Sequence, residues 1–217
     1  MNQNKPILRG RIHQGAFYLT CLLSIGYLIF CPFGGWETGI TIYLLSQLIL
    51  YGISSTYHTK KFKTEEARRH FQRLDHGSIF FLISGTQSCV VLTMLPYSDQ
   101  IRNILIITWT ITIIGLLKVI FILDRYDTLD VVFYILHGVS IVPFFKYVYD
   151  NVSLIDVILF ILGGIIYISG GIIFRLKRPD PNPKVFGYHE VFHVFTVIAN
   201  LCFLIPIFKE YILKYFH

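Results

Sequence analysis

Residues 153–174 read SLIDVILFILGGIIYISGGIIF, and this stretch decides the fold class. It is predominantly apolar and has the length of about 20 residues that a helix needs to cross the hydrocarbon core of a membrane. Because lipid offers no hydrogen-bond partner to a polar backbone, a segment of this kind should be helical throughout. The stretch therefore predicts one membrane-spanning helix.

The composition of the whole chain agrees with a membrane-embedded protein. Of the 217 residues, 54% are hydrophobic and 15% are charged, and the mean hydropathy is +0.59. A soluble domain of this size has too small an interior for so many apolar side chains, whereas lipid-facing helices can display them. Seven stretches of spanning length can be marked, at residues 16–34, 38–57, 75–95, 101–123, 129–148, 153–174 and 189–212. They predict an all-α integral membrane protein, a single seven-transmembrane helix bundle over residues 1–217.

The first stretch follows basic residues and could be mistaken for a signal peptide. However, no small-x-small cleavage pattern follows it, and FCPFGGWETG (residues 30–39) leads directly into the second apolar stretch. We therefore expect the first stretch to be retained as a span.

The Lys and Arg residues predict how the bundle is oriented. Fourteen of the 19 lie in the N-terminal tail and in the second, fourth and sixth connections: Lys5, Arg9, Arg11, Lys60, Lys61, Lys63, Arg68, Arg69, Arg73, Arg125, Arg175, Lys177, Arg178 and Lys184. Since basic residues collect on the cytoplasmic side of membrane proteins, the N-terminus is expected in the cytoplasm and the C-terminus outside. Clusters between apolar runs do not form a basic domain, so the net charge of +6 does not indicate nucleic-acid binding.

The four cysteines indicate neither a disulfide framework nor a thiolate metal site. All of them fall in apolar segments, and no CxxC pair occurs; they are Cys21, Cys31, Cys89 and Cys202. We expect them to be small residues of the core.

Several polar side chains stand inside or at the ends of the apolar stretches. Ionisable residues in a span cost roughly 2.5–3.5 kcal/mol each on insertion scales, which makes them candidates for function. Those of interest are Ser54, His58, Asp75, His76, His137, His189, Glu190 and His193. The expected topology brings the end of the second span and the beginnings of the third and seventh spans to one depth, near the cytoplasmic face.

The histidines at this depth suggest a metal centre. His189 and His193 are four residues apart and therefore share one face of a helix, and His58 can approach them from the second span. Three imidazole nitrogens with one position left for water suit Zn²⁺. Asp75 could hydrogen-bond the metal-bound water or act as a base, while Ser54 orients either partner.

The H-x-x-x-H spacing alone is a weak signal. With eight histidines in the chain, it arises by chance in roughly one in four sequences of such composition. His189 could instead be an interfacial side chain that extends towards water. The arrival of three spans at one depth favours the metal centre.

The other polar residues have simpler interpretations. His76 could hydrogen-bond a neighbouring helix, and Glu190 could accept from exposed N–H groups in the first turn of the last helix. A helix–helix hydrogen bond is favoured over a functional role for His137. Loop or terminal positions are expected for His13, His70 and His217.

Five pieces of the chain carry a family resemblance. They are LRGRIHQGAF (residues 8–17), SSTYH (54–58), RLDHGSIFFLISGT (73–86), GGIIYISGGIIFRLKRPDPNP (163–183) and FGYHEVFHVF (186–195). Together they resemble the hemolysin III family, the bacterial branch of the progestin and adipoQ receptor superfamily. The likeness extends over nearly the whole chain and implies an integral protein of the bacterial cytoplasmic membrane.

The resemblance also implies a site and a chemistry. It implies a zinc ion held by His58, His189 and His193 on the cytoplasmic side, with Asp75 and Ser54 near the metal-bound water. The relatives include adiponectin receptors and alkaline ceramidases, which points towards hydrolysis of a lipid amide. One departure is visible: the family usually has tyrosine, threonine and proline where this chain has QSC (residues 87–89).

Two classes of function therefore remain at the level of sequence. The first is a zinc-dependent lipid amide hydrolase with catalytic Asp75 and Ser54, for which membrane lipid is both the environment and the substrate. The second is a non-enzymatic membrane protein, either a sensor or receptor with a structural zinc or a pore-forming cytolysin. A structural zinc prefers four protein ligands, and only three good ones are apparent, which favours an open site.

Overall fold

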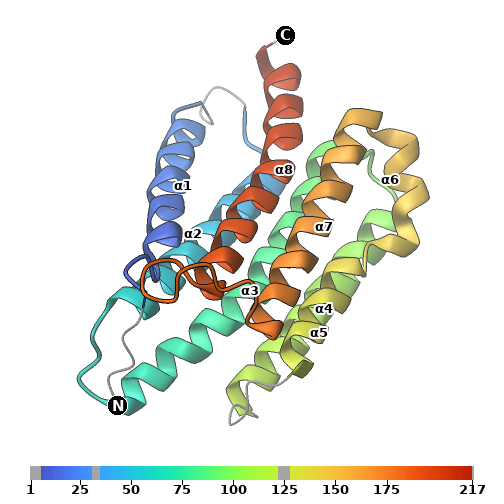
Figure 1. Cartoon of the computed structure of the whole chain (residues 1–217). Helices are drawn as coiled ribbons and strands as arrows, with labels where there is room; N and C mark the ends of the chain where they lie inside the picture. Colours follow the sequence, from blue (N-terminus) through green and yellow to red (C-terminus); the bar gives the residue numbers. More distant parts are fainter. Residues whose placement is uncertain (1–5, 31–34, 122–127, 217) are drawn as a thin grey trace.

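The described residues, 6–30, 35–121 and 128–216, fold into helices and short connections, with no strand among them (Figure 1). The elements of this computed structural model are α1 Arg11–Phe30, α2 Thr38–Thr59, α3 Glu65–Met94, α4 Asp99–Phe121, α5 Thr128–Val139, η2 Val142–Phe144, α6 Phe145–Asn151, α7 Leu154–Leu176 and α8 Tyr188–Phe216. Seven spans in this part of the chain are long and apolar enough to cross a membrane, when the stretch from α5 to α6 is counted as one. The predicted all-α, seven-helix fold class is confirmed.

Some expected features fall on positions that the structure does not describe. The ends expected for the first and fourth spans, at residues 31–34 and 122–123, are outside the described residues, as are Lys5, Cys31, Arg125 and His217. The other three cysteines are free thiols; Cys89 and Cys202 are buried and Cys21 is half-buried.

Two helices begin earlier than their apolar stretches. α1 begins at Arg11 rather than at residue 16, and α3 begins at Glu65 rather than at residue 75. The side chain of Thr64 accepts a hydrogen bond from the backbone N–H of Ala67 at 3.2 Å, which caps the start of α3. The capped start thus extends α3 well before its apolar stretch.

The fifth span is broken, whereas the sequence predicted one continuous segment over residues 129–148. α5 ends at Val139, and a short 3₁₀ turn that contains Pro143 leads into α6. Proline has no N–H to donate and its ring obstructs the preceding turn, which favours an interruption here. The side-chain amide of Gln87 donates to the carbonyls of His137 (3.0 Å) and Gly138 (3.1 Å), so the end of α5 does not leave these groups unsatisfied.

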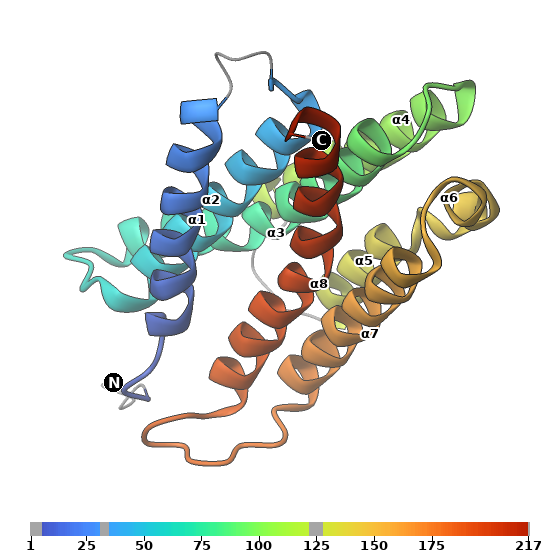
Figure 2. The same ribbon diagram turned by 90° about the horizontal axis from the view of Figure 1, so that it is seen from above.

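α3 lies at the centre of the bundle and packs against α2, α4, α5 and α8. α1 packs on α2 and α8, and α7 packs on α8 and α5, as the view from above shows (Figure 2). Large apolar side chains on the outward faces of α1, α4 and α7, such as Leu22, Ile113 and Ile165, are exposed. In a membrane these faces contact lipid, so their exposure has no unfavourable solvation cost.

Apart from His137, the polar residues of interest gather at one end of this bundle. α2 ends there at Thr59, and α3 and α8 begin there. We call it the histidine end, because His58 and His189 both lie at it.

Candidate metal centre

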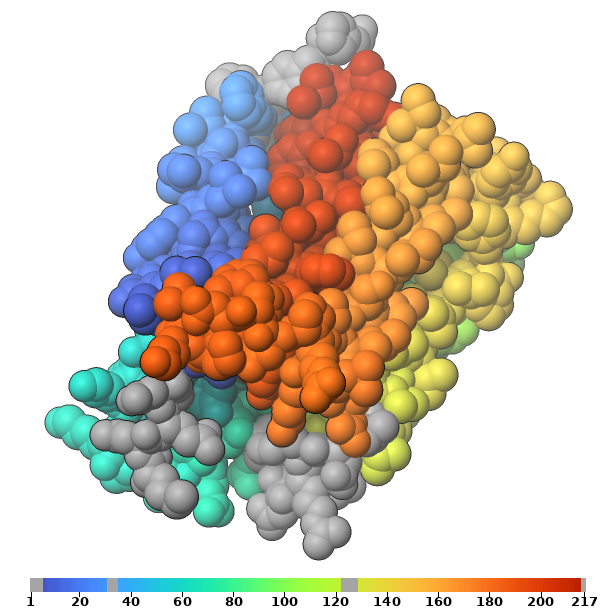
Figure 3. Space-filling model, in the orientation of Figure 1, coloured from blue at the N-terminus to red at the C-terminus, as the bar shows by residue number. Residues whose placement is uncertain are grey.

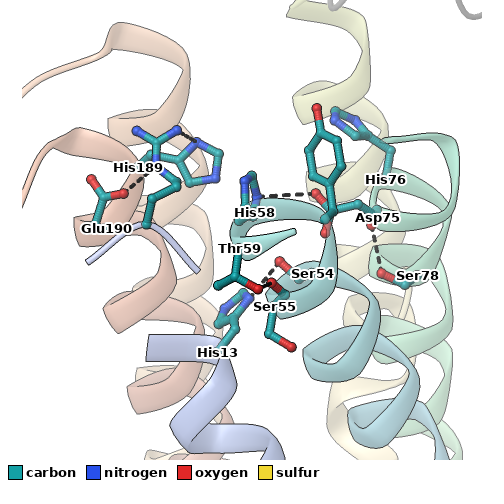
Figure 4. A network of polar contacts seen from close by, with 12 residues as sticks. His13, Ser54, Ser55, His58, Thr59, Asp75, His76, Ser78, His189 and Glu190 are labelled. Carbon is teal, nitrogen blue, oxygen red and sulfur yellow. Dashed lines mark hydrogen bonds and ion pairs between the residues drawn. The ribbon is translucent and has the colours of Figure 1, made fainter. Parts of the chain in front are cut away.

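Three histidines come together at the histidine end. His58 lies in the last turn of α2, and His189 and His193 lie on successive turns at the start of α8. Each offers one ring nitrogen, and these three atoms lie within 4.8 Å of one another. The rings of His58 and His189, which Figure 4 shows side by side, meet edge to face with their centroids 4.6 Å apart. The structure thus brings together the three residues that the sequence predicts as metal ligands.

The surroundings of these nitrogens fit a metal ion. His58 and His193 are buried, and within the described chain His58 Nε2 and His193 Nδ1 make no hydrogen bond. Leaving a buried polar atom without a partner costs about 1–3 kcal/mol. A cation between the rings would satisfy such lone pairs, and an all-imidazole donor set is one that Zn²⁺ favours. The residues present therefore fit the zinc ion that the sequence suggests.

Asp75 and Ser54 border this set. The carboxylate of Asp75, near the histidine end of α3, lies 3.5 Å from His58 Nε2, a contact that is too long for a good hydrogen bond. Ser54 is one turn before His58 on the same face of α2, and its side chain is buried. The structure places both predicted catalytic residues beside the histidines.

The site opens into a cavity inside the bundle. The cavity has a volume of about 630 Å³ and lies between α3, α5, α7 and α8. Its polar end is lined by Ser54, Asp75, His189 and His193, and most of its remaining wall is apolar, reaching Val148 and Phe203. Such a volume and lining are typical of pockets that bind apolar ligands.

A fourth histidine belongs to the site although the sequence predicted a loop position for it. His13 lies in the first turn of α1 and is only 2% exposed. Its ring stacks on that of His193, with centroids 3.7 Å apart, and its Nδ1 lies 2.9 Å from the hydroxyl oxygen of Ser54. The loop assignment was wrong because α1 begins before its apolar stretch. The piece LRGRIHQGAF was the only signal in the sequence that singled out this segment.

Glu190 takes part in more than helix capping. One carboxylate oxygen accepts from the backbone N–H of Gly187 at 2.8 Å, as expected for the first turn of α8. The other oxygen forms an ion pair with Arg9, and the side chain of Glu190 is fully buried. Arg9 also approaches Nδ1 of His189 at 3.5 Å. Nothing in the sequence indicates that the segment before α1 meets the start of α8 here.

The remaining polar residues take no part in the histidine set. His137 is buried elsewhere in the bundle, where its Nε2 contacts the hydroxyls of Thr108 (2.9 Å) and Ser84 (3.2 Å). This is the helix–helix contact that the sequence favoured. His76 lines the cavity beside Asp75. His70 is exposed on α3 rather than in a loop.

Comparison with known proteins identifies the family. The family model described as "Haemolysin-III related" matches residues 1–204. The chain therefore belongs to the hemolysin III family. Among curated relatives, "Hemolysin-3" of Bacillus cereus is 30% identical over 157 residues, which are 72% of this chain and 68% of that protein. The "Hemolysin-3 homolog" of Bacillus subtilis (strain 168) is 28% identical over 183 residues, 81% of this chain and 82% of the homolog.

Membership of the hemolysin III family agrees with the seven apolar helices, and the chain is an integral membrane protein of this family. The matched range includes α1 with His13 as well as Asp75 and the histidines of α2 and α8. The whole candidate centre thus lies within the part of the chain that defines the family.

Proposed function

We propose that this hemolysin III protein is a zinc-dependent hydrolase that cleaves a lipid amide within the membrane. The observation that carries the proposal is the position of the three-histidine set, which stands at the polar end of an apolar cavity with Asp75 beside it. A site of this kind can hold a reactive carbonyl near a metal while an acyl chain fills the apolar part.

The zinc ion would be held by His58, His189 and His193. When bound, it would make a water molecule more acidic and polarise the substrate carbonyl. Three protein ligands leave a coordination position open, as catalytic zinc sites do. A purely structural zinc would prefer a fourth protein ligand, and the described residues supply three His, Cys, Asp or Glu ligands in this group.

The chain's own residues would supply the remaining chemistry. Asp75 is near enough to the set to take a proton from the attacking water and to pass it to the leaving amine, which yields a fatty acid and a free amine. The Ser54 hydroxyl could donate a hydrogen bond to the oxygen of the carbonyl as negative charge develops there. The apolar wall would keep bulk water from the site and align the acyl chain.

The orientation of the bundle is part of the proposal. The basic connections between α2 and α3 and between α7 and α8 lie at the histidine end. We propose that this end faces the cytoplasm, with the C-terminus on the other side of a bacterial inner membrane. The substrate would then be a lipid of that membrane, reached from within the bilayer.

The test uses the full chain in lipid nanodiscs, loaded with zinc and mixed with an N-acylsphingosine or another N-acyl lipid. We expect release of free fatty acid, and a decrease of about 10²-fold or more for Asp75→Asn with the zinc content unchanged. Asp99→Asn is the matched control, because Asp99 is exposed and pairs with Arg102 at the start of α4. Retained zinc without fatty-acid release from any lipid amide or ester would exclude the hydrolase.

The relatives' name, Hemolysin-3, suggests a different function, that of a cytolysin. Nothing in the arrangement of the helices favours this function, since the outward faces are apolar, as in a resident membrane protein. Lysis of red cells by the purified protein, abolished in His193→Ala, would reverse the preference. A sensor with structural zinc would retain the metal and remain inert towards every lipid.

A further inference from the structure

The segment that precedes α1 is hydrogen-bonded to the connection between α7 and α8. The backbone N–H groups of Ile7 and Leu8 donate to the carbonyls of Lys184 and Val185, each at 3.1 Å. These carbonyls belong to the connection between α7 and α8. The space-filling view shows the first described residues, in dark blue, lying against that connection, in orange (Figure 3). We refer to residues 6–13 as the N-terminal clamp.

Arg9 connects the clamp with His189. Its ion pair with Glu190 joins a partly exposed guanidinium to a fully buried carboxylate, and its Nη1 lies 3.5 Å from His189 Nδ1. A buried carboxylate without a partner is strongly destabilising, so Glu190 depends on Arg9. Because Glu190 also accepts from Gly187, the pair fixes the first turn of α8, and this turn carries His189.

Gly10 allows the clamp to pack closely against His58. A Cβ atom at Gly10 would lie only 2.7 Å from Cβ of His58, and the φ angle of Gly10 is +78°, a conformation in which other residues are strained. The backbone of the clamp therefore packs directly on the last turn of α2. A side chain at this position would have to displace His58.

His13 carries the clamp to His193. The ring of His13 stacks face to face on that of His193, with the two planes parallel within 5°, and Nδ1 of His13 is hydrogen-bonded to the hydroxyl of Ser54. The ring limits the rotation of His193 on one side. Each of the three histidines is thus contacted by a different residue of the clamp.

We propose that the N-terminal clamp is a working part of the metal centre: Arg9 and His13 are positioning residues that hold His189 and His193 in place and slow the exchange of the metal. The inference rests on the proposed zinc site but not on hydrolysis. Partners of this kind around metal ligands contribute about 10–100-fold to metal affinity. The clamp also covers the histidines where it crosses them, which is consistent with access of substrate from the cavity.

The experiment measures zinc release to an excess of a chromogenic chelator from the zinc-loaded full chain in nanodiscs. We expect Arg9→Met to release zinc about 10-fold faster than the wild type, which is the lower end of the 10–100-fold range. Arg102→Met is the matched control, because Arg102 lies outside the clamp, is exposed and pairs with Asp99 at the start of α4. It should release zinc at the wild-type rate.

A double variant separates positioning from folding. Arg9→Met leaves Glu190 buried and unpaired, whereas Arg9→Met/Glu190→Gln removes the charge and keeps an acceptor for Gly187. We expect the thermal stability of the double variant to recover while zinc release stays fast. Recovery of the wild-type release rate together with stability would overturn the positioning role of Arg9.

A second pair of variants tests the ring of His13. His13→Ala should accelerate release, and His13→Phe, which keeps a ring against His193, should restore slow release. His70→Ala, on the exposed surface of α3, is the control. If the wild type retains zinc, and the Arg9 and His13 variants release zinc at the wild-type rate, the clamp has no role. If the wild type binds no zinc, the proposed function itself fails.

Discussion

Two polar groups that contain histidine lie among the helices, three histidines at the histidine end and the single His137, and they differ in how the ring nitrogens are satisfied. At the histidine end, ring nitrogens of three helix-borne histidines converge within 4.8 Å, and the group opens into a cavity. Around His137, by contrast, the imidazole is surrounded by the hydroxyls of Ser84 and Thr108, which lie on α3 and α4. One group is arranged around a space and the other around hydrogen bonds.

The difference shows what makes an intramembrane polar group a candidate site. Polar side chains in spans are expensive, and both groups would stand out by that criterion. His137 offsets part of its cost within the protein, because its Nε2 contacts hydroxyls of two neighbouring helices, whereas its Nδ1 makes no hydrogen bond to the described residues. At the histidine end, the unsatisfied ring nitrogens need a bound ligand to offset the cost of their burial. Convergence of unsatisfied atoms, rather than polarity, is therefore the informative feature.

The largest effect is expected from removing a ligand of the histidine set. His193→Ala should lower the zinc content of the detergent-purified protein from about one per chain to almost none, because two imidazoles bind zinc far more weakly than three. His137→Ala is the matched control and should retain the metal. The measurement is elemental analysis after gel filtration. Equal zinc contents in the two variants would remove the distinction between the groups.

Removal of the metal should destabilise the wild type. A ligand present at 100 to 1,000 times its Kd stabilises the folded state by about 3–4 kcal/mol. A chelator should therefore lower the Tm of zinc-loaded wild type by roughly 10 °C. His193→Ala should show no response to the chelator. A chelator-sensitive Tm in that variant would place the metal elsewhere in the chain.

A smaller effect is expected at His137. His137→Leu removes the partner of the Thr108 and Ser84 hydroxyls, and this should cost about 1–2 kcal/mol of unfolding free energy. The Tm of the variant, measured in the same detergent, should fall by a few degrees while its zinc content stays that of the wild type. A loss of zinc here would mean that the two groups are coupled.

The smallest effect is expected from Thr108→Val. Single hydrogen bonds between membrane helices contribute about 0.6 kcal/mol on average, and the hydroxyl of Ser84 would still contact His137. We expect a Tm within about 2 °C of the wild type. A decrease as large as that of His137→Leu would show that Thr108 alone satisfies the imidazole.

The parts of the fold that depend on local sequence could be predicted. Seven apolar stretches of spanning length predict seven helices, and the i, i+4 spacing of His189 and His193 places both on one face. The break at Pro143 was harder to foresee, because Pro206 stands inside α8 and that helix continues. The two prolines differ in context: near Pro143, the side-chain amide of Gln87 on α3 donates to the carbonyls of His137 and Gly138.

The parts of the site that depend on distant contacts could not be predicted. Arg9 and Glu190 are 181 positions apart, and nothing in either neighbourhood indicates the other. His13 becomes buried only because α1 packs on α2 and α8. Counting spans placed the three candidate metal ligands at one depth, but a depth does not specify which side chains of other helices surround them.

The ion pair between Arg9 and Glu190 also has a consequence for biogenesis. The arginine precedes α1, and the glutamate belongs to α8, which is synthesised later. Until α8 is made, the preceding helices therefore hold an incomplete centre. When α8 is inserted, its Glu190 pairs with Arg9, which was synthesised earlier. The proposed zinc site needs His58 of α2 together with His189 and His193 of α8, so zinc would bind only after α8 has been inserted, and zinc loading would report that step of assembly.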